Sequence, residues 1–291
     1  ALDVRAMWGY AYARWDEMWR ADDLKVKERQ VAGVNLRQNL FKKRAHIGLS
    51  YIRTDDSDRQ LVNDQLYRND IGSVNYSLEL IPKKLTVSGE SAVSSTDESP
   101  RANAARKKYE GMAHRVQGVL KPSDPHTFTV LYERVDPKFR TLTGAADTDR
   151  EKTQICWAFK TSPVTQLGAN FLWYRNQLEN ANGRTETYRP ELTLNTSKLL
   201  KREKNRLRMS VAVENQEIET RNQSLANVYS SVGYSDELFK VLNSATDFGV
   251  TRADSFAKDK DKLDYTFKQS FGYTHSFSSN LTLKPTLNFG T

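Results

Sequence analysis

The sequence predicts an all-β fold, a transmembrane antiparallel up-and-down β-barrel of about 14 strands, or a segment of a larger barrel. Three observations predict it. Segments of about eleven residues alternate between apolar and polar side chains along most of the chain. Aromatic residues are frequent in the apolar rows, and the connections alternate between short and long. Because a strand turns successive side chains to opposite faces, each segment would present one apolar and one polar face.

The clearest segment covers residues 263–277. Every second residue there is apolar or aromatic, apart from Gln269 and His275, and polar residues fill the positions between them. The full row is Leu263, Tyr265, Phe267, Gln269, Phe271, Tyr273, His275 and Phe277. Long two-faced strands with aromatics on the apolar face are typical of membrane-spanning strands.

Twelve further segments show the same alternation, and each is compatible with the roughly 9–11 residues that a tilted membrane strand needs. In chain order, with their apolar rows, they are 2–14 (Val4, Ala6, Trp8), 29–40 (Val34, Leu36, Leu40), 45–54 (Ile47, Leu49, Tyr51), 71–81 (Val74, Tyr76, Leu78, Leu80), 84–94 (Leu85, Val87, Val93), 110–120 (Met112, Val116, Leu120), 126–136 (Phe128, Val130, Tyr132), 151–161 (Ile155, Trp157, Phe159), 165–177 (Leu167, Ala169, Phe171, Trp173), 186–196 (Tyr188, Leu192, Leu194), 205–218 (Leu207, Met209, Val211, Val213) and 280–290 (Leu281, Leu283, Leu287, Phe289). Soluble strands average about five to six residues. The lengths therefore favour membrane strands over the core of a soluble sandwich.

The connections form two sets. Short ones are expected at 41–44, 82–84, 121–125, 162–165, 197–205 and 278–280, and long ones at 15–27, 54–70, 95–109, 137–150, 180–185 and 221–261. In an up-and-down barrel, the short links lie at one rim and the long links at the other. A Greek-key sandwich has no reason to keep this rhythm. The longest loop is expected at 221–261, with a short helix near 236–242 and a strand extension at 226–234.

Charged residues concentrate on the polar rows, because a charge facing lipid at mid-bilayer costs roughly 2–4 kcal/mol. The candidates for a water-filled lumen are Arg5, Arg37, Glu79, Glu90, Arg115, Glu133, Lys160, Glu191, Arg206, Arg208, Glu214, Asp264, Lys268 and Lys284. One interpretation is a pore with a weak preference for anions. The other is that opposite charges pair across neighbouring strands and hold the wall together.

Aromatic residues occupy the apolar rows, several of them near strand ends. The candidates for lipid contact are Trp8, Tyr10, Tyr12, Tyr51, Tyr132, Trp157, Trp173, Tyr188, Tyr265, Phe267, Phe271 and Tyr273. This placement is typical of interfacial girdles. The alternative is a core packed between two soluble sheets.

The composition limits the other classes of function. The 291 residues are 38% hydrophobic and 27% charged, with 5 Trp, 13 Tyr and 12 Phe, which argues against disorder. The net charge of +8 is spread over turns and loops without a recognisable nucleic-acid motif, so no nucleic-acid partner is expected. Cys156 excludes an internal disulfide framework. The His spacings and the absence of phosphate-loop motifs predict no metal, no cofactor, no catalytic residues and no enzyme activity.

Thirteen strands is an odd number, whereas bacterial single-chain barrels have even numbers. One strand is therefore expected to be hidden within 221–261, giving fourteen. The alternative is that the chain, which begins at Ala1 rather than Met, is a piece of a larger barrel.

Taken together, the alternating strands and the two sets of connections resemble a Gram-negative outer-membrane β-barrel of the porin-like architectural class, without the motif of a specific family. The resemblance implies one barrel domain over 1–291, located in the cell outer membrane with its lipid as a partner. It further implies a channel for small hydrophilic solutes. The alternative is a scaffold that sheathes or docks a partner protein, such as a secreted chain or an electron-carrying cytochrome. A third hypothesis is a barrel hydrolase.

Overall fold

The computed structural model describes residues 2–12, 28–56, 66–99, 107–141, 148–179, 183–198, 205–218, 223–238, 242–255, 262–273, 275–278, 281–283 and 286–290. Its strands are β1 (Leu2–Tyr12), β2 (Glu28–Leu40), β3 (Ala45–Asp56), β4 (Leu66–Ile81), β5 (Leu85–Ser99), β6 (Lys107–Ser123), β7 (His126–Val135), β8 (Arg150–Ser162), β9 (Thr165–Asn176), β10 (Thr185–Ser197), β11 (Arg206–Ile218), β12 (Gln223–Leu238), β13 (Leu242–Ser255), β14 (Lys262–Tyr273), β15 (His275–Ser278), β16 (Leu281–Leu283) and β17 (Thr286–Gly290). A 3-10 turn, η1 (Phe41–Lys43), links β2 to β3.

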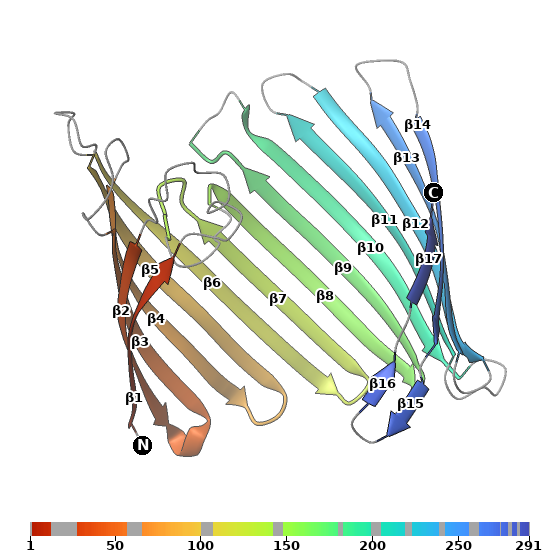
Figure 1. The fold of residues 1–291 in the computed structure, drawn as a ribbon, viewed down its shortest axis with the longest axis horizontal. Coiled ribbons are helices and arrows are strands. Elements are labelled where there is room, and N and C mark those ends of the chain that lie inside the picture. Colours follow the sequence, from red (N-terminus) through yellow and green to blue (C-terminus); the bar gives the residue numbers. More distant parts are fainter. Residues whose placement is uncertain are drawn as a thin grey trace. The chain divides into compact units, whose positions relative to one another are not determined.

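The strands follow one another through the sheet in chain order, from β1 to β14, and β17 then pairs with β14 (Figure 1). Each strand pair whose register is defined is antiparallel. The structure thus confirms the predicted all-β, antiparallel, up-and-down fold class. None of the helices in the described residues is long and apolar enough to span a membrane.

Within each part of the sheet whose register is defined, the register places the predicted apolar rows on one face. Val4 pairs with Leu36, Leu36 with Leu49 and Leu49 with Val74. At the other end of the chain, Met209 pairs with Val232, Val232 with Phe248 and Phe248 with Phe267. A shift of one residue in any ladder would send these side chains to the opposite side. In each unit, we call the side that carries these rows the apolar face and the opposite side the polar face.

The stretch 221–261 is not the long loop that the sequence predicts. It holds β12 and β13, which pair along their length, so two strands lie there rather than the one expected. The helix expected near 236–242 is also wrong for its described part, because β12 continues to Leu238 and β13 begins at Leu242. Both strands are rich in Ser, Asn, Thr and Asp, which weakens the alternating pattern.

The predicted strands at 263–277 and 280–290 are each interrupted. β14 ends at Tyr273, β15 and β16 form a separate small hairpin, and β17 returns to pair with β14 between Lys268 and Gly272. The large sheet therefore contains fifteen strands in the described part of the chain, and the number stays odd.

The chain divides into two compact units. The first comprises 1–119, 131–152 and 176–180, and the second comprises 120–130, 153–175 and 181–291. The first unit holds β1–β5 and most of β6, and the second holds β10–β17 and most of β8 and β9. The single domain expected over 1–291 stays a prediction.

Candidate functional site

The apolar face carries large side chains that no other part of the described chain covers. Trp8 is 69% exposed, Leu192 66% and Tyr265 61%. Among the other predicted lipid contacts, Tyr51, Phe267 and Phe271 are exposed, and Tyr132, Trp157, Trp173 and Tyr188 are half-buried. The side chains of Tyr10, Tyr12 and Tyr273 lie outside the described residues. A soluble protein would bury such a surface, because a large contiguous apolar patch favours association or membrane contact.

The apolar face changes to aromatic and then to charged residues where the strands reach the long connections. The Tyr51 hydroxyl donates to Asp70 Oδ1 over 2.5 Å. The Tyr132 hydroxyl donates to Glu151 over 2.9 Å, and that of Tyr188 to Glu186 over 2.8 Å. Aromatic rings with a polar tip that reaches a charged residue suit the boundary between apolar and aqueous surroundings.

The opposite end of the apolar face carries an aromatic cluster on β7 and β8. The ring of His126 stacks on Phe159 at 4.5 Å between centroids, and Phe128 lies 6.4 Å from Trp157. Trp157 Nε1 donates to His126 Nδ1 over 3.2 Å, which satisfies the indole N–H. This cluster lies close to the short turn between the end of β6 and the start of β7.

On the polar face, several predicted lumen residues form pairs. Glu133 lies between Arg115, at 4.0 Å, and Arg150, at 3.4 Å. Glu214 pairs with Arg189 at 3.8 Å, a partner that the sequence prediction missed. These contacts favour the second interpretation of the charges, in which pairs hold neighbouring strands together.

The other predicted polar-face residues have weaker or local contacts. Arg5 pairs with Asp3 at 2.9 Å, the Arg37 guanidinium lies 3.3 Å from His46 Nδ1, and Glu191 accepts from Asn170 over 3.5 Å. Glu79 accepts from the Lys83 backbone N–H, Glu90 is exposed, and Lys268 lies opposite Asp247 in the ladder. The Asp264 side chain and the whole of Lys284 lie outside the described residues.

The chain crosses the polar face of β4–β6 immediately after β7. Residues 136–141 turn back over the wall, and Phe139 is only 6% exposed. The Asp136 backbone N–H donates to the carbonyl of Met112 over 2.9 Å, and Asp136 Oδ2 accepts from the Met112 N–H over 3.1 Å. The sequence predicted here only the end of the 126–136 strand and a long connection, because the partners of the segment lie far away along the chain.

Arg140 holds this 136–141 segment to the wall. Its backbone N–H donates to Ser94 Oγ over 3.1 Å, and its carbonyl accepts from Asn69 Nδ2 over 3.0 Å. Its guanidinium pairs with Glu98 at 3.6 Å and lies 3.8 Å from the centroid of Tyr109. The fully buried polar side chains Thr54, Asn69 and Thr96 lie on the same face of these strands. The segment therefore covers part of the polar face of the first unit.

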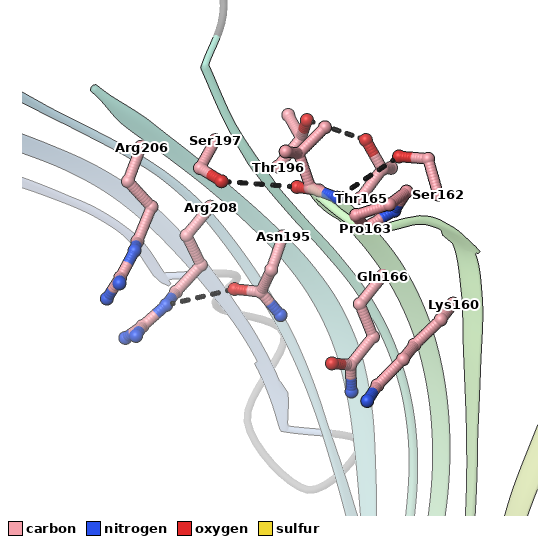
Figure 2. A pocket seen from close by; sticks show the side chains of 11 residues that line it. Lys160, Ser162, Pro163, Thr165, Gln166, Asn195, Thr196, Ser197, Arg206 and Arg208 are labelled. Atoms are coloured by element: carbon pink, nitrogen blue, oxygen red, sulfur yellow. Dashed lines mark hydrogen bonds between the residues drawn. The ribbon is translucent and has the colours of Figure 1, made fainter. Parts of the chain in front are cut away.

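A second feature of the polar face is a basic groove in the second unit, with a volume of about 470 Å³. Figure 2 shows Lys160, Arg206 and Arg208 directed to the same side of the sheet, with Gln166 and Asn195 between them. Its complete lining is Lys160, Ser162, Pro163, Val164, Thr165, Gln166, Asn195, Thr196, Ser197, Arg206 and Arg208. The sequence prediction named the three cations but had no means to bring them together.

Comparisons with known proteins identify no family. No family model matches the chain, and no curated protein matches it. Two solved structures that it resembles are substituted variants of the porin of Rhodopseudomonas blastica. The first is 8% identical, covers 92% of this chain and 98% of its own, and has a TM-score of 0.31. The second is 9% identical, covers 100% of both chains and has a TM-score of 0.31. At these values, function has to be argued from the sheet itself.

Proposed function

We propose that this chain forms a β-barrel in the outer membrane of a Gram-negative bacterium and conducts small hydrophilic solutes. One observation carries the proposal. Within each unit the strands share one exposed apolar face, and away from the strand ends the charged residues lie mainly on the opposite face. A sheet in lipid must close on itself, because every backbone group there needs a partner. The residues facing the enclosed space would then be the polar ones.

The dimensions of the apolar face suit a bilayer. On β4 the apolar face is bounded by the charged residue Asp70, four residues inside the strand on the side of the long connection, and by Leu80, next to the short turn. Ten steps of about 3.3 Å give about 33 Å along the strand. A tilt of about 40° reduces this to about 25 Å, the height of the apolar band of an outer-membrane barrel.

The polar face suits a water-filled space better than a dry protein interior. Many of its charged side chains remain half-exposed or exposed, among them Arg37, Glu90 and Arg115. An unpaired charge in a dry core would carry a large desolvation penalty. Water inside the barrel removes that penalty, which is why charged lumen residues are tolerated.

Two measurements on purified protein test the proposal. A closed barrel resists detergent at low temperature, so unheated and boiled samples should migrate differently in a gel. In planar bilayers the protein should then produce stable conductance steps. Identical migration would contradict the barrel, and a folded barrel that never conducts would contradict the channel.

A scaffold that docks a partner protein is the second candidate, and the 136–141 segment favours it. This segment already covers part of the polar face with a buried Phe139, and an interior filled by protein does not conduct. A heat-modifiable barrel that is silent in bilayers and purifies with a stoichiometric partner would support this candidate instead.

A further inference from the structure

We propose that the basic groove on β8–β11 is a binding site for a small phosphate-bearing solute on its way through the barrel. The inference deepens the channel proposal and rests on it for the access of water to the polar face. The groove gathers residues from four neighbouring strands at the ends next to the short turns. Lys160 lies on β8, Gln166 on β9, Asn195 on β10, and Arg206 and Arg208 on β11.

The charge of the groove is unbalanced. No carboxylate is among its lining residues. Within the part of the chain that the structure describes, Lys160, Arg206 and Arg208 form no ion pair, whereas Arg115, Arg150 and Arg189 on the same face all do. A set of like charges kept together without counterions attracts an anion from solution.

The acidic residue Asp247 lies on β13, beyond the groove. Asp247 lies two strands away from Arg208 in the ladder, with Gly233 between them. Its Oδ1 lies only 2.5 Å from the position of a Cβ at Gly233, so the carboxylate extends over the glycine towards β11. It does not come within ion-pair distance of Arg208, and it leaves the excess of positive charge in place.

The donors suit an oxyanion with several oxygen atoms. Arg208 Nε donates to Asn195 Oδ1 over 3.4 Å, which orients the guanidinium and leaves its terminal N–H groups for a ligand (Figure 2). Arg206 supplies a second planar guanidinium group, and the ammonium group of Lys160 and the amide of Gln166 line the same groove. Guanidinium groups bind phosphate in a bidentate manner, and a doubly charged phosphate uses more of these donors than a carboxylate does.

The groove has room for a solute larger than the bare ion. A volume of about 470 Å³ lies within the range of small-molecule sites, roughly 300–1,000 Å³. Its hydroxyl groups already bond to each other or to backbone, as in the 2.8 Å contact between Thr165 and Thr196. Specificity would therefore come from the cations and the two amides. The expected ligand class is a phosphate monoester of a small polar molecule.

The test measures phosphate binding by isothermal titration calorimetry on the folded, detergent-purified protein, with inorganic phosphate as the probe and chloride as the background salt. The variant R206Q/R208Q should bind at least ten-fold more weakly than the parent. The control R5Q/R37Q loses the same charge from the same face outside the groove, and it should bind like the parent. Both variants must show the heat-modifiable band.

The outcomes separate this inference from the channel proposal. Phosphate binding that R206Q/R208Q abolishes supports the groove even if the protein never conducts, in which case only the channel fails. Equal phosphate affinity in the parent and in R206Q/R208Q overturns the groove even if the protein conducts. Micelles doped with phosphatidylglycerol form a second arm. If that lipid competes with phosphate in the parent but not in R206Q/R208Q, the groove binds a lipid headgroup. This result would overturn the proposal that its ligand is a soluble phosphate-bearing molecule.

Discussion

Gly111 on β6 is the residue that lets the 136–141 segment lie against the wall. A Cβ at this position would come within 2.2 Å of the backbone nitrogen of Phe139 and 2.5 Å of its Cα. Neither atom belongs to a flexible side chain, so a larger residue would have to displace the segment. Glycine is needed here because two backbones approach each other closely. Its backbone conformation does not require glycine, since its φ is not positive.

The substitution G111A should therefore loosen the 136–141 segment without unfolding the strand. Overpacking should destabilise the docked segment by about 1–3 kcal/mol. This corresponds to about a 5- to 150-fold larger population of molecules in which the segment has detached from the wall. Trypsin cleaves after Lys138 and Arg140, and mass spectrometry should show faster cleavage there. The control G118A lies on the same strand with no atom within 4 Å of its new Cβ, and its cleavage rate should match the parent's. Equal rates in both variants would contradict the close approach.

Asn69 on β4 should also hold the 136–141 segment to the wall, through its hydrogen bond to Arg140. It is fully buried and bonds both Thr96 Oγ1, at 2.8 Å, and the carbonyl of Arg140. N69A should raise tryptic cleavage at Lys138, because loss of a buried partner costs about 1–3 kcal/mol. If both residues hold one segment, the effects of N69A and G111A should not add in the double variant. Additive effects would place Asn69 outside this contact.

At the level of the strand, alternation predicted the faces well and the boundaries less well. Strands such as β4 and β11 have apolar residues at nearly every second position, so the sequence predicted their apolar rows. It also predicted the range of β11, whereas β4 begins at Leu66, before the expected start at 71. In β12 and β13 the apolar row is interrupted by residues such as Ser230 and Thr246, so the sequence pattern of a strand is weak there. These two segments are strands because they pair with each other and with β11 and β14. The 136–141 segment and the basic groove both depend on contacts between distant residues, which a single sequence does not show.

The two faces of β11 provide a test within one strand. Val211 lies on the apolar face and is 52% exposed, and Ser210 lies on the polar face beside Ser231. V211R should reduce the free energy of unfolding from lipid vesicles by about 2–4 kcal/mol, because an arginine would face the bilayer. S210R adds the same charge one residue away and should have a far smaller effect. Urea titration of the heat-modifiable band measures both, and equal losses would contradict a lipid-facing row.

At the scale of the whole molecule, the links between strands define two ends of the first unit. The short turn between β4 and β5 includes Lys84, whereas Thr148 precedes β8 at the end of a long connection, and both side chains are exposed. In outer-membrane barrels short turns face the periplasm and long loops face the outside. A cysteine at 148 should therefore be accessible on intact cells, and a cysteine at 84 should be accessible only after the outer membrane is opened.

Labelling with a membrane-impermeant maleimide tests this orientation in a C156S background. The background should be mild, because Cys156 Sγ donates to Asn170 Oδ1 at 3.2 Å and a serine hydroxyl keeps that donor. T148C should react on intact cells at least ten-fold faster than K84C, and permeabilisation should make the two rates equal. The reverse order would mean an inverted barrel. Equal labelling on intact cells would mean that no membrane separates the two ends, and the exposed apolar face would then need a partner other than lipid.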